Sequence, residues 1–115
     1  MKTVLFAFNG EPMCFAHVLL NAFDLQARGH EVQVVIEGSA TRLVQAFHDD
    51  PDQPFAAMYQ QAVDAGLVAC VCRACAAKMA SLESAEAQAL PLCDEMSGHP
   101  SIGRFLAEGY QVLTF

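Results

Sequence analysis

Continuous apolar runs alternate along this chain with segments in which apolar residues recur every three or four positions. The runs predict buried β-strands, and the three-to-four spacing predicts amphipathic helices. Five strands are predicted, at residues 2–8, 31–36, 67–72, 90–93 and 110–115. Helices are predicted between them, at residues 11–28, 55–64, 73–80, 81–89 and 101–108, with one more that carries Leu43, Val44 and Phe47.

This alternation predicts an α/β fold, in which a five-stranded, mainly parallel sheet carries helices on both of its faces. The main loop is predicted at residues 48–54, which are acidic and contain two prolines. No segment is long enough to act as a linker, so residues 1–115 are expected to form a single domain.

The composition narrows the class of protein. Apolar residues make up 54% of the chain and charged residues 17%, which excludes a disordered protein. Thirteen acidic and six basic residues give a net charge of −7, which argues against binding to nucleic acid or to an anionic membrane. No apolar run approaches the roughly 18 residues of a membrane span, and the first residues lack a signal-peptide pattern. We therefore expect a cytoplasmic protein.

The first predicted helix is apolar on more than one side. Met13, Leu20 and Phe23 lie outside the stripe that is expected to face the core. Either the helix is wedged between the sheet and a loop, or it contributes to an interface between copies of the chain. We favour the interface, and expect a homo-oligomer, because the apolar content is high for so short a chain.

Binding sites in open parallel sheets form outside the carboxyl ends of the strands, which meet at one edge. Four segments of the chain are expected at that edge. They are Asn9-Gly10-Glu11, Glu37-Gly38-Ser39, Cys72-Arg73-Ala74-Cys75 and Ser97-Gly98-His99. The candidate ligand-binding residues among them are Asn9, Gly10, Glu11, Glu37, Arg73, Ser97, Gly98 and His99.

Cys72 is the strongest candidate nucleophile, because it lies where a buried strand gives way to a helix. The free N–H groups of a helix N-terminus, together with Arg73, would stabilise a thiolate and lower the pKa of the thiol. Cys75 follows one turn later and could act as a resolving thiol. The alternative is that cysteines in an apolar run are small core residues, and this is the favoured interpretation of Cys70.

The chain has five cysteines, an odd number that cannot all be paired in disulfides within one chain. In a reducing compartment we expect thiols, metal ligands or redox groups rather than a disulfide framework. The Cys-x-x-Cys spacing also fits a metal site, but only one clear pair is present and zinc sites usually need four ligands. Further candidate ligands are Cys14, His17, Cys93 and His99. A thioredoxin-like exchange is less favoured because its motif follows the first strand of its unit, and we expect no resident cofactor or metal.

Two carboxylates and one histidine could take part in chemistry at this edge. Glu11 and Glu37 could orient a ligand or transfer protons, or they could cap helices and face water. His99, in a loop beside Gly98, could bind an anion or shuttle a proton, or it could have no role. Residues 8–12 contain a single glycine, so a phosphate-binding fingerprint is absent.

The order of these parts resembles the DsrE/DsrF-like family of small sulfur-relay proteins over nearly the whole chain. The segments that carry the resemblance are Phe8-Asn9-Gly10-Glu11-Pro12, Ile36-Glu37-Gly38, Val71-Cys72-Arg73-Ala74-Cys75-Ala76-Ala77-Lys78 and Gly109-Tyr110-Gln111-Val112-Leu113-Thr114-Phe115. The resemblance implies a three-layer α/β/α fold and an oligomer. It also implies that Cys72, which follows the third strand, accepts sulfane sulfur as a persulfide and passes it on.

The expected function is therefore a sulfur relay, in which Cys72 and Cys75 are the catalytic residues if the protein acts as a sulfurtransferase. Its partners would be a sulfur donor or acceptor protein or a small sulfur species. Two alternatives stay open. One is a metal-binding Cys/His module, and the other is a non-catalytic oligomeric subunit that binds a partner at the strand ends.

Overall fold

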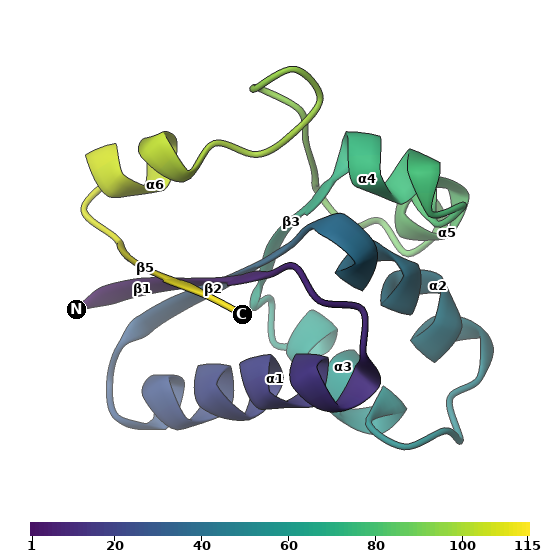
Figure 1. The fold of residues 1–115 in the computed structure, drawn as a ribbon. Coiled ribbons are helices and arrows are strands. Elements are labelled where there is room, and N and C mark those ends of the chain that lie inside the picture. The colour runs from purple at the N-terminus through teal and green to yellow at the C-terminus, as the bar shows by residue number, and fades with distance from the viewer.

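A five-stranded sheet runs through the middle of the molecule (Figure 1). The structure is a computed structural model that describes residues 1–115. The strands are β1 (Lys2–Ala7), β2 (Glu31–Ile36), β3 (Val68–Cys72), β4 (Leu92–Cys93) and β5 (Gln111–Thr114). They lie in the order β4-β3-β2-β1-β5. Every pair of neighbouring strands is parallel, which confirms the predicted class of fold.

The predicted helices are all present. They are α1 (Pro12–Ala27), α2 (Arg42–Asp49), α3 (Ala56–Asp64), α4 (Arg73–Lys78), α5 (Leu82–Ala87) and α6 (Ile102–Ala107), and a short 3₁₀ helix over Gly38–Thr41 precedes α2. The predicted loop at residues 48–54 starts later than expected because α2 continues to Asp49. None of the helices combines the length and the apolar composition that crossing a lipid bilayer requires.

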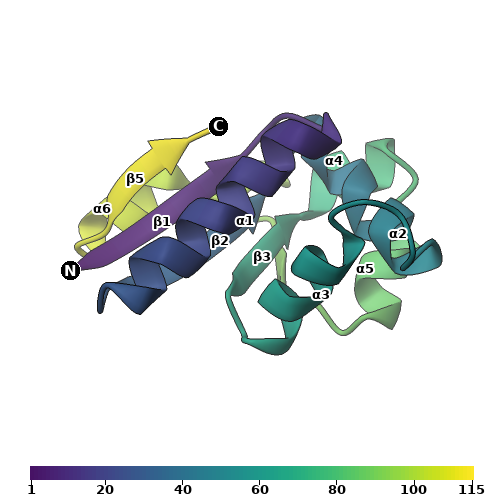
Figure 2. The same cartoon turned by 90° about the horizontal axis from the view of Figure 1, so that it is seen from below.

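The helices cover the two faces of the sheet unequally. Helices α1 and α3 lie along one face, and α6 lies over the other face next to β5 (Figures 1 and 2). The larger apolar cluster joins the first face to α1, α2 and α3, and also includes one buried alanine each from α4 and α5. The smaller cluster lies on the second face and consists of Val4, Phe6, Val35, Cys70, Cys93 and Phe105. The molecule therefore has the expected three layers.

Three aromatic rings hold the helices of the larger cluster together. Phe15 of α1, Phe47 of α2 and Tyr59 of α3 are buried, with ring centroids 5.6 to 6.5 Å apart. Burying each such side chain is worth about 1.5–3 kcal/mol. The Tyr59 hydroxyl donates a hydrogen bond of 2.7 Å to Gln88, just after α5. These contacts fix α1, α2 and α3 on one another and tie α3 to the end of α5.

The loops after β1 and β2 pack directly on one another. Gly38 has φ +55°, and a Cβ atom there would lie 2.8 Å from the carbonyl oxygen of Phe8, so only glycine fits. The Ser39 hydroxyl accepts a 2.9 Å hydrogen bond from the Gly10 N–H, and the Arg42 guanidinium donates to the Gly10 carbonyl. Gly10 therefore has a structural part in this edge of the sheet.

Cys70 and Cys93 form a disulfide between β3 and β4, with their Cα atoms 5.6 Å apart. The expectation that the cysteines form no disulfide is wrong for this pair, and Cys14, Cys72 and Cys75 are free thiols. The reason is the order of the strands. Because β4 lies beside β3, Cys93, whose register partner is Cys72, also comes within disulfide distance of Cys70. The hydrophobic pattern alone does not fix which strands are neighbours. Both cysteines are buried.

Candidate functional site

Four side chains that could react or bind a ligand meet at the carboxyl ends of β2 and β3. They are Glu37 at the end of β2, Cys72 at the end of β3, Cys75 in the first turn of α4, and His99 in the loop that precedes α6. Their side-chain donor atoms all lie within 4.8 Å of one another. The four come from three of the four segments that the sequence predicts at this edge.

His99 Nδ1 is the atom that links the cluster. It lies 3.1 Å from Cys72 Sγ, 3.7 Å from Cys75 Sγ and 3.9 Å from Glu37 Oε1. One imidazole nitrogen is therefore within reach of two thiols and a carboxylate. Depending on its tautomer, this nitrogen accepts the proton of the Cys72 thiol or donates its own.

The loop that carries His99 is held against the N-terminus of α4. The Gly98 carbonyl accepts a 3.0 Å hydrogen bond from the Ala74 N–H, and it also accepts from the Cys72 thiol at 3.6 Å. Met96 and His99 exchange two backbone hydrogen bonds of 2.8 and 3.0 Å, which close the loop. Gly98 has φ +91°, and a Cβ atom there would lie 3.1 Å from the Ala74 Cβ. The position of His99 therefore depends on a glycine at 98.

Burial controls the acidity of Cys72. The side chain is fully buried, and this raises the pKa of its thiol to about 12. The Cys75 N–H, which donates to Cys72 Sγ over 3.4 Å, lowers the pKa, while the Cys75 thiol and Glu37 raise it further. The lowered pKa predicted from the helix N-terminus is therefore wrong, because desolvation outweighs a single N–H donor. Cys72 needs a base or a cation nearby to give up its proton.

Glu37 is a buried acid. Its side chain is only 10% exposed, and burial raises the pKa of its carboxyl, with His99 acting in the opposite direction. Its one ion-pair partner is His99 Nδ1, at 3.9 Å. The sequence predicts either a functional carboxylate or a solvated one at this position, and the structure places it inside the cluster, away from water.

A family model that describes the DsrE/DsrF-like family matches residues 2–115. The chain belongs to the DsrE/DsrF-like family. An uncharacterized protein of Methanocaldococcus jannaschii is 28% identical over 97 residues, which cover 84% of this chain and 76% of the relative. Two uncharacterized proteins of Archaeoglobus fulgidus match shorter segments. One is 42% identical over 40 residues, or 35% of this chain and 66% of the relative, and the other is 49% identical over 37 residues, or 32% of this chain and the whole relative. No solved structure matches the chain significantly.

The other predicted site residues of this DsrE/DsrF-like chain lie outside the four-residue cluster. Arg73 does not pair with a sulfur atom; its guanidinium forms an ion pair of 3.1 Å with Asp94. The Glu11 carboxylate accepts from the Cys14 N–H at 3.1 Å and so caps α1. The Asn9 side chain accepts from the Glu11 N–H at 2.9 Å. Ser97 contributes a turn with φ +51° next to Gly98.

The alternative metal ligands are also dispersed. Cys14 is exposed on α1, neither it nor His17 belongs to the cluster, and Cys93 is in the disulfide. Sequence reasoning missed Asp94 as the partner of Arg73 and the Gly98 carbonyl as the acceptor for Cys72. Asp94 follows β4 directly, so the rule of strand ends could have included it.

The cluster lies away from the point where the strand order reverses. That point is between β1 and β5, where a crevice would ordinarily form. Here the backbone ladder continues past the strands, since the Phe8 N–H donates to the Phe115 carbonyl at 2.9 Å. The four clustered side chains of this DsrE/DsrF-like fold instead lie at the ends of β2 and β3, in the first turn of α4 and in the loop after β4.

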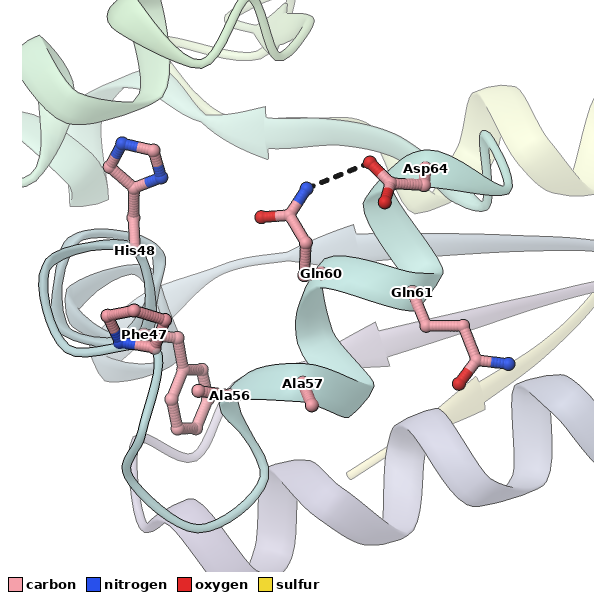
Figure 3. A pocket seen from close by; sticks show the side chains of 8 residues that line it. Phe47, His48, Ala56, Ala57, Gln60, Gln61 and Asp64 are labelled. Atoms are coloured by element: carbon pink, nitrogen blue, oxygen red, sulfur yellow. Dashed lines mark hydrogen bonds between the residues drawn. The ribbon is translucent and has the colours of Figure 1, made fainter.

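A hollow of about 450 Å³ lies elsewhere, between α2 and α3 (Figure 3). Its lining residues are Phe47, His48, Pro51, Ala56, Ala57, Gln60, Gln61 and Asp64. Figure 3 shows the 2.8 Å hydrogen bond by which Gln60 donates to Asp64. No cysteine lines this hollow, and the cluster of potential metal ligands lies outside it.

Proposed function

We propose that this protein is a sulfur carrier that holds sulfane sulfur as a persulfide on Cys72. Membership of the DsrE/DsrF-like family suggests sulfur relay for the family as a whole. The observation that carries the assignment to Cys72 is the 3.1 Å separation between its Sγ and His99 Nδ1. A buried thiol becomes a nucleophile when a neighbouring base takes its proton, and His99 is that base.

Loading is a transfer of one sulfur atom between two thiols. His99 Nδ1 takes the Cys72 proton as Cys72 Sγ attacks the outer sulfur of a donor persulfide. The S–S bond of the donor breaks, and its electron pair leaves on the inner sulfur. The imidazolium of His99 then returns the proton to this departing thiolate. The products are a Cys72 persulfide and the donor thiol, with no net oxidation.

Cys75 provides a way to release the sulfur. Its Sγ lies 3.7 Å from His99 Nδ1, so the same base can take its proton. When Cys75 attacks the inner sulfur of the Cys72 persulfide, a Cys72–Cys75 disulfide forms and hydrogen sulfide leaves. An external dithiol reductant then restores both thiols. Alternatively, an acceptor thiol takes the outer sulfur directly and leaves Cys72 reduced.

Access to Cys72 requires motion of the loop that carries His99. Cys72 is fully buried, whereas Cys75 is partly exposed and the His99 side chain is 39% exposed. Gly98 and His99 are the groups that contact Cys72 Sγ from this loop. A donor therefore reaches Cys72 only when these two residues move away from it.

The test is sulfur loading followed by mass spectrometry. Protein with reduced free thiols is incubated with polysulfide, its intact mass is recorded, and its peptides are mapped. We expect the mass of one sulfur atom on the Cys72 peptide, reversible by reduction, in wild type and in the matched control Cys14→Ser. We expect none in Cys72→Ser. Loading that persists in Cys72→Ser overturns the assignment, and an absence of loading on every thiol favours a binding subunit instead.

The setting of this relay is also part of the proposal. We place it in the cytoplasm, where Cys72 and Cys75 stay reduced, and where burial protects the Cys70–Cys93 disulfide from reductants.

We further propose a homo-oligomer that covers Met13 and Leu20 of α1, which are 59% and 49% exposed. The native mass checks the number of chains, and Leu20→Glu should dissociate the assembly. A monomeric wild-type protein excludes this interface.

A further inference from the structure

We propose that Glu37, Cys72, Cys75 and His99 form a tetrahedral binding site for a thiophilic divalent cation, with Zn²⁺ as the best fit. This site goes beyond the sulfur relay and does not depend on it, because it rests only on the arrangement of four donor atoms. The donors are two thiol sulfurs, one imidazole nitrogen and one carboxylate oxygen, all within 4.8 Å of one another.

The distances from His99 Nδ1 to the other three donors come close to those in the coordination shell of zinc. Bonds of about 2.0–2.3 Å to a tetrahedral Zn²⁺ place its ligand atoms about 3.3–3.8 Å from one another. His99 Nδ1 lies 3.1 Å from Cys72 Sγ, 3.7 Å from Cys75 Sγ and 3.9 Å from Glu37 Oε1. Since the four atoms lie within 4.8 Å of one another, a cation at their centre needs side-chain movements of about 1 Å or less.

The backbone holds these donors from several directions. Cys72 and Cys75 lie on either side of the first turn of α4, where the Cys75 N–H donates to Cys72 Sγ at 3.4 Å. Glu37 comes from the end of β2, next to the tight contact between Gly38 and Phe8. His99 is fixed through the hydrogen bond from Ala74 to Gly98. Ligands held by separate elements favour a defined geometry over a flexible surface site.

The types of donor select the metal. Thiolates and imidazole suit Zn²⁺ and similar soft or borderline cations, whereas Mg²⁺ and Ca²⁺ require mainly oxygen ligands. Glu37 adds an anionic donor that is mostly shielded from water and has only His99 as an ion-pair partner. A bound cation compensates the charge of this carboxylate. On binding, both thiols lose their protons to solvent, so two protons leave for each Zn²⁺ that enters.

The ligand set differs from the one that the spacing of cysteine and histidine suggests. Cys14 and His17 stand three residues apart on α1 but do not belong to the cluster, and Glu37 provides the fourth ligand instead.

Metal and persulfide compete for the Cys72 sulfur, because a coordinated thiolate cannot at the same time carry a second sulfur atom. A metal-loaded chain is therefore inactive as a carrier until the cation leaves.

The experiment measures metal binding directly. Wild-type protein with reduced free thiols, freed of metal by dialysis against a chelator, is titrated with Co²⁺ and then with Zn²⁺. We expect one Co²⁺ per chain with thiolate charge-transfer bands and the intense d–d bands of tetrahedral cobalt, which Zn²⁺ abolishes. Native mass spectrometry should show one zinc atom in place of two protons. A featureless cobalt spectrum, or octahedral bands without thiolate transitions, overturns the site.

Variants then identify the ligands. Cys75→Ser should weaken Zn²⁺ binding by more than about 100-fold, since removal of mere outer-shell partners already costs 10–100-fold. Glu37→Gln, which keeps the shape of the side chain, should weaken it by at least about tenfold. The matched control Cys14→Ser with His17→Gln should bind as wild type does. Unchanged affinity in Cys75→Ser or Glu37→Gln, or a loss in the control, overturns this ligand set. Sulfur loading is not measured, so the relay stands or falls separately.

Discussion

At the scale of single residues, the environment of Cys72 is the central problem of the site. The thiol is buried, and its pKa is raised to about 12, chiefly by desolvation. A thiol in this state is almost wholly protonated at neutral pH. The only imidazole in reach is His99, with Nδ1 3.1 Å away. The reactivity of Cys72 should therefore depend on His99 far more than on the helix N-terminus.

Replacing His99 tests this dependence. In His99→Ala we expect the rate of sulfur loading from polysulfide to fall by about 100-fold or more, which is the usual contribution of a positioned general base. Loading rates would be followed by quenched samples and intact mass. His48→Ala, which removes a histidine of α2 outside the cluster, is the matched control and should load as wild type does. A similar rate in both variants would show that His99 takes no part in proton transfer.

The pH dependence of alkylation reports on the same burial. Because thiolate is the reacting form, the rate at a thiol rises about tenfold per pH unit until its pKa is passed. The pKa of Cys72 is raised, so its alkylation by iodoacetamide should still be rising above pH 9 and level off only near 12. At neutral pH, exposed Cys14 should react first, then Cys75, and Cys72 last. Peptide mapping against time measures this order, and faster labelling of Cys72 than of Cys14 at pH 7 contradicts it.

At the scale of elements, the site depends on one short loop packed on one short helix. The segment Met96–His99 closes on itself and places the Gly98 carbonyl on the N–H of Ala74. Gly98 has φ +91°, which residues with a side chain rarely adopt, and a Cβ atom added there would lie 3.1 Å from the Ala74 Cβ. The contact couples the backbone of the loop to the first turn of α4, which carries both thiols.

Gly98→Ala should therefore damage the site as well as the fold. We expect a loss of about 1–2 kcal/mol in the free energy of unfolding from the positive φ, together with slower sulfur loading as His99 shifts. Gly109→Ala is the matched control, since it has φ +89° with no atom within 4 Å of an added Cβ. It should lose similar stability in urea unfolding but load normally. Equal loading in the two variants would show that the loop does not position His99.

Much at this scale was predictable from the sequence, for physical reasons. The strand at Glu31–Ile36 coincides with its predicted range because its apolar run is bounded by Gly29 and Gly38. Cys72, Cys75, His99 and Glu37 were all predicted at one edge because the carboxyl ends of parallel strands meet there. The contacts of Cys72 with Gly98 and His99 and the pairing of Arg73 with Asp94 were not predictable. Both depend on how a loop some twenty residues further along the chain folds back, which no local pattern encodes.

At the scale of the whole molecule, the order of the strands decides which residues meet. Placing β4 beside β3 brings the loop after β4 over Cys72, and it also brings Cys93 next to Cys70. The adjacency of β3 and β4 thus creates both the cluster and the disulfide. The handedness of the crossovers restricts the possible orders of the strands but does not select one. The position of β4 beside β3 could therefore not be predicted from the sequence.

The disulfide should contribute measurably to the stability of this arrangement. It joins residues separated by 23 positions, and closing a loop of that size in the unfolded chain is worth about 3 kcal/mol. Urea unfolding of wild type should therefore give a free energy about 3 kcal/mol lower with a strong dithiol reductant than without it. The double variant Cys70→Ala with Cys93→Ala should be insensitive to the reductant. A count of five free thiols in the denatured, untreated protein, or the same unfolding midpoint under both conditions, would show that the bond does not form.

Because β4 has only two residues in the sheet, loss of the bond should also free the loop after β4 and slow sulfur loading at Cys72.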